Sequence, residues 1–216
     1  LVATQALDVT DQVTQSYTVR VTDDFGAYVD QTVVITINGT NDVPVITNTA
    51  AAPSGAVIES GHADDGTAVA GTAVATGQLT ASDVDAEDNV GNQTWSLDGV
   101  PSATYGSFAI NASGEWTYTL NNSLAATQAL DEGDEVTETF AVQVADGNGG
   151  VATQSVNVTI TGTNDVPVIT NNAAALAGAV TESGLTPAGA AEAGTVTATG
   201  TLSASDVDTD ATQAWS

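Results

Sequence analysis

Apolar and polar residues alternate with a period of two along several segments of the chain, and this alternation predicts β-strands. Every second residue is apolar or aromatic in Trp116–Leu120, Phe140–Val144 and Val156–Ile160. A period of two places these side chains on one face of each strand. Each of these strands is therefore expected to bury one face against a second layer.

Shorter apolar segments separated by Gly- and Asp-containing turns predict further strands, whereas no segment has a convincing amphipathic helical pattern. Roughly seven to nine short strands in about 120 residues are typical of an antiparallel β-sandwich. The fold class is therefore predicted to be all-β. The shorter strands are expected at Val43–Thr47, Ala56–Glu59, Val74–Ala81, Gln93–Leu97 and Ser107–Asn111.

Long internal repeats indicate that the chain is an array of similar modules. Three segments recur 123 residues later: Ala3–Asp8 at Ala126–Asp131, Gly39–Asn48 at Gly162–Asn171, and Ala81–Asp85 at Ala204–Asp208. After the last of them, a three-residue deletion brings Trp95 level with Trp215.

The repeat divides the chain into one complete module and two partial ones. Residues 1–40 correspond to the end of a preceding repeat, 41–163 form a complete repeat, and 164–216 correspond to the start of a following repeat. Neither flanking piece contains a counterpart of residues 97–123. We therefore expect unpaired strands in both pieces, which invite strand exchange with other copies of the chain.

The charge balance changes the picture, because 27 Asp and Glu residues face one basic residue and the formal net charge is −26. Such a chain repels nucleic acids and anionic membranes, and its compact state needs cations. The absence of cysteine excludes disulfides and thiolate-bound metals. Calcium, which takes six to eight oxygen ligands, fits the abundant carboxylates.

Some acids recur one period later, while others do not. Asp83 and Asp85 have an Asp-x-Asp spacing, which places two carboxylates on the same side of an extended segment. Asp24 and Asp30, in contrast, become Gly147 and Thr153. The seven recurring pairs are Asp8 and Asp131, Asp11 and Asp134, Asp23 and Asp146, Asp42 and Asp165, Glu59 and Glu182, Asp83 and Asp206, and Asp85 and Asp208.

These motifs resemble those of cadherin-like domains. Asn-Asp-Val-Pro at 41–44 and 164–167 is similar to the cadherin inter-domain linker, and Ala81–Asp85 followed by Asn89 and Thr94–Leu97 is similar to the cadherin calcium strand. The chain most resembles the VCBS repeat of giant secreted bacterial adhesins of the RTX type.

The resemblance implies calcium ions at the junctions between modules. For the junction at 163–165 it implies the ligands Glu59, Asp131 or Asp134, Asn164, Asp165, Asp206 and Asp208. For the junction at 40–42 it implies Asp8 or Asp11, Asn41, Asp42, Asp83, Asp85, Asn89 and Asp146. The number of ions at each junction stays open, as do sites within one module.

Catalysis is not expected, because no nucleophile or phosphate-loop motif is present and the single His62 and single Arg20 do not recur. Both are expected to be solvent-exposed and without a role. The aromatic residues could alternatively form a sugar site of a lectin-like module, but their strand positions favour the core. These residues are Trp95, Trp116, Tyr105 and Tyr118.

The sequence thus predicts a calcium-stiffened spacer of a secreted bacterial surface adhesin, acting in cell-surface projection, adhesion and biofilm formation. Its partners are expected to be neighbouring repeats and other copies of the chain. No apolar run approaches the roughly 20 residues of a membrane span, so membrane insertion is not expected. The absence of an initiator Met and of a signal peptide indicates a piece of a longer protein. A composition rich in Thr, Ala, Val, Gly, Asn and Asp, and almost without Lys, Arg and Met, favours export to the bacterial cell surface.

Overall fold

The computed structural model describes residues 2–63, 65–85, 88 and 92–216. Apart from the short helix α1 (Val2–Gln5), the regular elements in this part of the chain are strands. The contacts group the chain into two compact units. The first comprises Leu1–Val57, Ala73–Asn121 and Val136–Ile160, and the second comprises Ile58–Thr72, Asn122–Glu135 and Thr161–Ser216.

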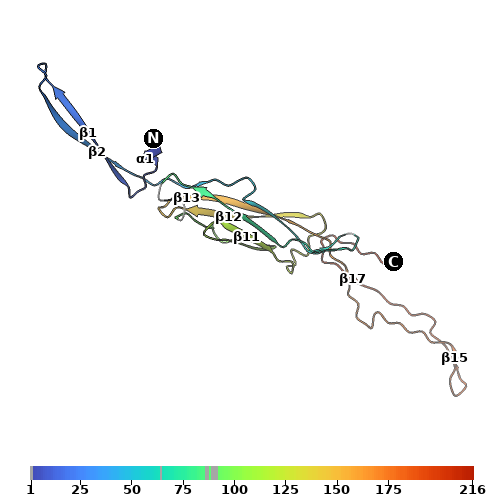
Figure 1. Cartoon of the computed structure of the whole chain (residues 1–216). Helices are drawn as coiled ribbons and strands as arrows, with labels where there is room; N and C mark the ends of the chain where they lie inside the picture. Colours follow the sequence, from blue (N-terminus) through green and yellow to red (C-terminus); the bar gives the residue numbers. More distant parts are fainter. Residues whose placement is uncertain (1, 64, 86–87, 89–91) are drawn as a thin grey trace. The chain divides into compact units, whose positions relative to one another are not determined.

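The first unit contains a β-sandwich of a three-stranded and a four-stranded sheet (Figure 1). Antiparallel pairing joins β10 to β11, β11 to β7 and β12 to β9. The strand order is β10-β11-β7 in one sheet and β4-β13-β12-β9 in the other. The strands are β4 (Ser54–Ile58), β7 (Val74–Gln78), β9 (Thr94–Leu97), β10 (Gly106–Ile110), β11 (Glu115–Leu120), β12 (Glu135–Ala145) and β13 (Val151–Thr161). The all-β sandwich predicted from the alternating pattern is confirmed.

The core lies between these two sheets and is built from the predicted alternating residues. The rings of Phe108 and Phe140 are stacked with centroids 4.4 Å apart, and Trp116 and Tyr118 are fully buried beside them. A Cβ on Gly77 would come 2.5 Å from Nε1 of Trp116, so this position in β7 has no space for a side chain. The aromatic candidates Trp95, Trp116 and Tyr118 therefore belong to the core.

Two predicted strands are shorter than expected, for reasons that lie in their hydrogen bonds. The segment 74–81 is interrupted after β7, because Leu79 N–H donates to Gly114 and Thr80 N–H donates to Oδ1 of Asn48. The chain resumes as β8 (Ala81–Ser82), which pairs with β3 (Val45–Ile46). β3 begins after Pro44, which has no N–H to donate.

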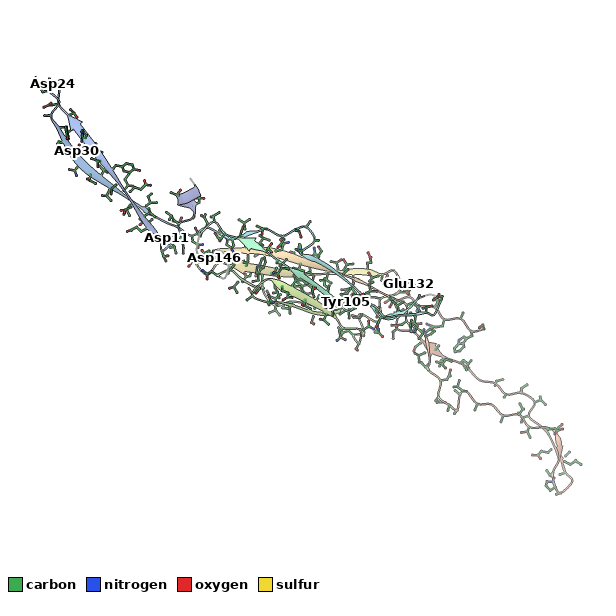
Figure 2. The ribbon with its side chains drawn as sticks, in the orientation of Figure 1. Asp11, Asp24, Asp30, Tyr105, Glu132 and Asp146 are labelled. Atoms are coloured by element: carbon green, nitrogen blue, oxygen red, sulfur yellow. The ribbon has the colours of Figure 1, made fainter. Side chains whose placement is uncertain are left out.

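A long β-hairpin precedes the sandwich strands in the first unit. Its strands β1 (Gln12–Thr22) and β2 (Tyr28–Asn38) are antiparallel, with Tyr17 opposite Val33. In the turn, Asp23 Oδ1 accepts hydrogen bonds from the N–H groups of Phe25 and Ala27. Side chains project from both faces of this hairpin (Figure 2), and one face carries most of its apolar residues.

The second unit contains short pairs of strands that repeat pairings seen earlier in the chain. β14 (Val168–Ile169) pairs with β17 (Ala204–Ser205) in the register of β3 with β8. β15 (Gly184–Leu185) pairs with β16 (Ala191–Glu192). Their register is that of β5 (Gly61–His62) with β6 (Ala68–Val69), and neither β5 nor β6 was predicted from the sequence. Within the described residues, no helix is long and apolar enough to cross a membrane.

Candidate metal centre

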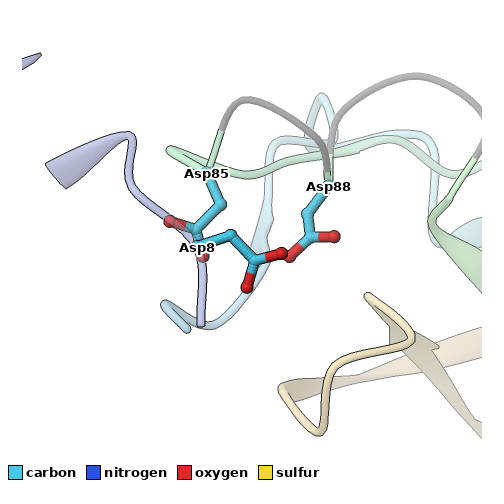
Figure 3. A group of neighbouring side chains, drawn as sticks. All are labelled: Asp8, Asp85 and Asp88. Carbon is cyan, nitrogen blue, oxygen red and sulfur yellow. The ribbon is translucent and has the colours of Figure 1, made fainter. Parts of the chain in front are cut away.

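Carboxylates and amides from four segments of the first unit converge beside the 40–42 junction. Five of these carboxylates are only 0–8% exposed. Figure 3 shows Asp8 from one segment of the chain reaching toward Asp85 and Asp88 from another. We call this group the N-terminal acidic cluster: Asp8, Asn41, Asp42, Asp83, Asp85, Asp88, Asp146 and Asn148. Two triplets in it, Asp8-Asp85-Asp88 and Asp83-Asp88-Asp146, have carboxylate oxygens within 4.8 Å of one another.

The linker backbone orients the Asp-x-Asp pair that follows β8. The N–H of Asp42 donates to Oδ2 of Asp85 at 2.7 Å, and the N–H of Asp85 donates to Oδ1 of Asp83 at 3.1 Å. These two bonds bring the linker and the Asp-x-Asp segment together although they are about 40 residues apart in sequence. The N-terminal acidic cluster thus combines the Asn-Asp linker with the Asp-x-Asp pair, the two motifs on which the resemblance to cadherin-like domains rests.

Asp146 enters the cluster from the turn between β12 and β13. Its Oδ1 accepts hydrogen bonds from the N–H groups of Asn148, Gly149 and Gly150, and its Oδ2 accepts one from Nδ2 of Asn41 at 3.1 Å. Burial opposes ionisation of Asp146, but these donors outweigh it and lower the pKa of the carboxyl. A Cβ on Gly150 would overlap the Asp146 carboxylate, so the turn needs glycine at this position.

The side-chain amide of Asn148 lies between two carboxylates of the cluster. Its Nδ2 contacts Oδ2 of Asp8 at 3.1 Å and both oxygens of Asp88 at 3.0 and 3.1 Å. An NH₂ group has two hydrogens for these three oxygens. Burial raises the pKa of Asp88, and the charges of Asp8, Asp146 and Asp83 add to this effect. The amide therefore donates hydrogen bonds to these carboxylates but supplies no positive charge.

The donor set fits a hard cation that prefers oxygen. It contains carboxylate and amide oxygens, and Oδ1 of Asn41 is buried without a hydrogen-bond partner. The sequence offers no Lys and one Arg, and Arg20 is engaged elsewhere. Its Nε and Nη2 lie 2.6 and 2.8 Å from the carboxylate of Asp30, and its guanidinium stacks 3.6 Å above the ring of Tyr28. Arg20 is exposed as expected, but it is paired.

A second group in the second unit repeats much of this geometry beside the 163–165 junction. The N–H of Asp165 donates to Oδ2 of Asp208 at 2.7 Å, and the N–H of Asp208 donates to Oδ1 of Asp206 at 3.3 Å. We call this group the C-terminal acidic cluster: Glu59, Asp131, Thr163, Asn164, Asp165, Asp206 and Asp208. Oδ1 of Asp208 and Oδ2 of Asp165 are buried without hydrogen-bond partners.

Glu59 is the most buried carboxylate of the C-terminal acidic cluster. Its Oε1 accepts a hydrogen bond from Gln128 at 2.9 Å, and its Oε2 accepts one from the N–H of Thr163 at 3.4 Å. Burial raises the pKa of Glu59 to about 7, and the charges of Asp165 and Asp208 contribute to the same shift. Burial also raises the pKa of Asp165 and of Asp208. The C-terminal acidic cluster therefore also brings several carboxylates together in a buried place.

The two clusters differ in how closely their ligand atoms approach. Among the described residues, triplets of carboxylates within 4.8 Å occur only in the N-terminal acidic cluster. In the C-terminal acidic cluster, Asp131 is half-buried and its charge raises the pKa of Asp208. Asp134 is exposed, and its carboxylate accepts a hydrogen bond from the backbone N–H of Asp131 at 3.2 Å. Asp8 and Asp11 divide in the same way, with Asp8 in the cluster and Asp11 bonded to its N–H.

Most of the predicted ligand residues lie in or beside these two groups. Asn89 lies outside the described residues. Asp88 and Asn148 were missed, because the deletion leaves Asp88 without a clear counterpart and Asn148 corresponds to Phe25.

The prediction that His62 is a solvent-exposed bystander is wrong. The residue is half-buried, because β5 lies against the linker. Its backbone N–H donates to the backbone carbonyl of Asn164 at 2.6 Å, and the ring atom Nδ1 is buried.

Solved structures similar to this chain include cadherin extracellular domains. The chain is similar to Drosophila N-cadherin EC1-4, at 14% identity and a TM-score of 0.42, over 77% of this chain and 37% of that one. It is similar to protocadherin gamma B2 domains 1-5 (16%, TM-score 0.37, 73% and 27%) and to mouse cadherin-23 EC22-24 (12%, 0.33, 73% and 43%). It thus spans less than half of each. No curated protein sequence matches.

The family assignment comes from a sequence profile that covers more than half of the chain. The profile of the bacterial cadherin-like domain matches residues 41–162, which contain the sandwich strands β4 to β13 and most of the N-terminal acidic cluster. The chain therefore belongs to the family of bacterial cadherin-like domains.

Proposed function

We propose that this chain is a calcium-stiffened spacer of a secreted bacterial surface adhesin, built from VCBS-type repeats. In this proposal calcium ions bind at the two acidic clusters and restrain the linkers at 40–42 and 163–165. The sandwich modules supply length, and they hold the adhesive part of a larger protein away from the cell surface. The proposal includes an extracellular location and a contribution to biofilm formation.

One observation carries the calcium part of the proposal. Asp8, Asp83, Asp85, Asp88 and Asp146 are buried together, and the chain has no free basic side chain to neutralise them. Buried carboxylates are tolerated when they are paired with opposite charge or coordinate a metal. Calcium takes six to eight oxygen ligands in flexible geometry, and the cluster supplies carboxylate and amide oxygens. A divalent cation is the simplest source of the missing charge.

Within each cluster the residues have different roles. In the N-terminal acidic cluster, Asp83, Asp85, Asp88 and Asp146 would hold the ion, together with Asp8. The N–H of Asp42 orients Asp85, and the glycine-rich turn after β12 orients Asp146 through three N–H groups. In the C-terminal acidic cluster, Glu59, Asp165 and Asp208 would be the corresponding ligands, with Asp131 and Asp206 beside them.

The spacer part of the proposal rests on the presence of linker residues in both acidic clusters. Each cluster joins a linker to an Asp-x-Asp segment about 40 residues later, and an ion that binds both restrains the linker. A cadherin-like module is typically not an enzyme. The buried positions of Trp95, Trp116 and Tyr118 also count against a lectin-like sugar site on these aromatic residues.

Calcium titration with two readouts tests the proposal. Melting temperature should rise with calcium, because an ion that binds only the folded state stabilises it by mass action. Magnesium should have a smaller effect, since it needs a near-octahedral shell and loses water reluctantly. Small-angle scattering of the same samples should give a larger maximum dimension in calcium than in chelator. Equal melting curves and equal dimensions in calcium and chelator would contradict the proposal.

A double substitution separates stiffening from folding. Asp206→Ala with Asp208→Ala, in a chain extended to a complete third repeat, should shorten the particle in calcium while the melting of the central sandwich changes little. An unchanged maximum dimension together with lost calcium binding would show that the ion does not restrain the linker.

A further inference from the structure

The side-chain amide of Asn148 lies where the two carboxylate triplets of the N-terminal acidic cluster meet. Asp88 is the residue that the two triplets share. Nδ2 of Asn148 lies 3.0 and 3.1 Å from the two oxygens of Asp88 and 3.1 Å from Oδ2 of Asp8. One uncharged nitrogen is therefore in contact with three carboxylate oxygens that belong to two side chains.

The turn between β12 and β13 holds the amide in this place. Gly147 and Gly149, on either side of Asn148, have φ angles of +94° and +113°, which glycine adopts without strain. Oδ1 of Asp146 accepts hydrogen bonds from the backbone N–H groups of Asn148 and of the two glycines that follow it. Because these bonds use the backbone of Asn148, its side-chain amide can be removed without loss of them.

The contact with Asp8 connects the two sides of the linker at 40–42. Asp8 precedes the linker in sequence, whereas Asp88 and Asn148 follow it within the complete repeat. The amide therefore joins the two sides through hydrogen bonds to one carboxylate from each. An ion that is bound by Asp8 and Asp88 would make the same connection through the same oxygens.

The amide and such an ion need the same space. An NH₂ group directs its two hydrogens at the lone pairs of these oxygens, and calcium takes the lone pairs of its ligand oxygens from about 2.3–2.6 Å. Because Nδ2 of Asn148 is only 3.0–3.1 Å from the three oxygens, an ion that bridges Asp8 and Asp88 from the side of the amide has to displace it.

The amide is not a general feature of the repeat. Asp146 corresponds to Asp23 one repeat earlier, but Asn148 corresponds to Phe25. A phenylalanine side chain has no N–H or O–H that could donate to a carboxylate. Position 148 can therefore differ between modules while the neighbouring acid stays, and this is expected of a residue that sets the calcium affinity of one junction.

We propose that the side-chain amide of Asn148 competes with calcium for the oxygens of Asp8 and Asp88. The competition rests on the proposed function, because it requires that calcium binds the N-terminal acidic cluster. In chelator the amide joins Asp8 to Asp88 across the linker, and in calcium the ion replaces it. The amide thus stabilises the metal-free protein and raises the calcium concentration at which this linker becomes bound to an ion.

Calcium titration of the natural chain and of Asn148→Ala tests the competition by its sign. The φ angle of Asn148 is not positive, so alanine can take its place without strain. Asn148→Ala should bind calcium at the N-terminal acidic cluster roughly tenfold more tightly, because the ion no longer has to break hydrogen bonds to carboxylates. Asn148→Asp, which replaces the donor with another carboxylate, should shift the affinity in the same direction.

Melting curves give the other half of the same thermodynamic cycle. Asn148→Ala should melt at a lower temperature than the natural chain in chelator and at the same temperature in saturating calcium, because the amide acts only where no ion replaces it. The control is Gln31→Ala, which removes an exposed amide from β2 and should match the natural chain in the titration and in both melts.

Nuclear magnetic resonance of the side-chain amide gives a readout that does not depend on affinity. The Asn148 signal is the side-chain ¹H–¹⁵N pair that is missing from the spectra of both variants. Calcium should shift this signal and speed up the exchange of its hydrogens with water, because the amide is released from the two carboxylates.

The outcomes separate this inference from the proposed function. If the natural chain binds calcium while Asn148→Ala binds it equally or more weakly, the competition is overturned and the proposed function stands. An Asn148 amide signal that calcium leaves unchanged overturns the competition in the same way. A natural chain that binds no calcium overturns the proposed function, and the competition with it.

Discussion

The backbone N–H of Asp42 donates a 2.7 Å hydrogen bond to Oδ2 of Asp85, and a bond of the same length joins Asp165 to Asp208 one repeat later. In both places the linker holds one oxygen of the second Asp in the Asp-x-Asp pair. In the later copy, the other oxygen, Oδ1 of Asp208, is buried without a partner. The linker thus fixes the direction of a carboxylate that is available to a cation.

Removal of the Asp85 carboxylate should reduce calcium binding at the N-terminal acidic cluster. Asp85→Ala is expected to weaken calcium binding at the N-terminal acidic cluster by at least about tenfold and to reduce the calcium-dependent rise in melting temperature. Calorimetric titration measures the first effect and differential scanning calorimetry the second. Asp98→Ala, which removes an exposed carboxylate from a turn, is the control and should change neither. Identical titrations of the two variants would exclude Asp85 as a ligand.

Asp88→Asn should have effects of opposite sign in chelator and in calcium. In chelator the variant is expected to melt at a higher temperature, because it removes a carboxylate whose pKa is raised by burial and by Asp8, Asp146 and Asp83. In saturating calcium it should melt at a lower temperature than the natural chain, because one ligand is lost. Paired melts in the two conditions measure this crossover. A variant that is stabilised in both conditions would show that Asp88 does not bind the ion.

Glu59 should make the metal-free protein less stable as pH rises. Its pKa is about 7 in the folded chain, against an ordinary value of 4.5. A raised pKa gives a stabilising contribution that is complete below pH 4.5 and is lost as pH rises through about 7. Urea unfolding in chelator across this range should show the decline, and Glu59→Gln should reduce it. Calcium should oppose the decline, since the metal binds the ionised carboxylate.

The two hairpins offer a matched test of core packing. Phe140→Ala should destabilise the chain by about 3–5 kcal/mol, because Phe140 is buried and stacked on Phe108. Tyr17→Ala, at the corresponding position of β1, should cost less than about 1 kcal/mol in a dilute monomeric sample, because Tyr17 is half-exposed. Denaturant unfolding gives both values. Similar losses at the two positions would mean that the β1 face is already covered.

A second core prediction concerns Glu138, the buried acid of β12. Its Oε2 accepts a 2.6 Å hydrogen bond from the hydroxyl of Tyr118, and its Oε1 accepts bonds from the N–H groups of Thr104 and Tyr105. Tyr118→Phe leaves this carboxylate short of one donor and should destabilise the chain by about 1–3 kcal/mol. Adding Glu138→Gln should recover part of the loss in denaturant melts. Full additivity of the two substitutions would contradict the coupling.

The sandwich could be predicted from the sequence because each long strand repeats one physical pattern. Phe140, Val142 and Val144 alternate with outward residues, and the structure buries all three. The short pairs β5–β6 and β15–β16 were missed, because two-residue strands carry no periodicity. The break after β7 also escaped prediction, since it depends on bonds from Leu79 and Thr80 to residues distant in sequence.

Candidate ligands were found by their recurrence, and recurrence also limited the search. Asp83 and Asp85 have clear counterparts, so they could be selected without a structure. Asp88 follows them by only a few residues, but the deletion removes its counterpart and with it the signal. Asn148 corresponds to Phe25, and only the fold shows that its amide meets Asp8 and Asp88. The place of Asn148 in the site thus depends on contacts that the local sequence does not encode.

The pairing of Arg20 with Asp30 has a consequence for cleavage of the chain by proteases. Proteases of the trypsin class cut after Lys or Arg, and this chain presents them with a single cleavable bond. That bond lies inside β1, where the backbone is paired with β2 and the guanidinium is held by Asp30 and stacked on Tyr28. Within these 216 residues, a composition with one basic residue therefore leaves proteases of this class a single site, and that site lies in a paired strand.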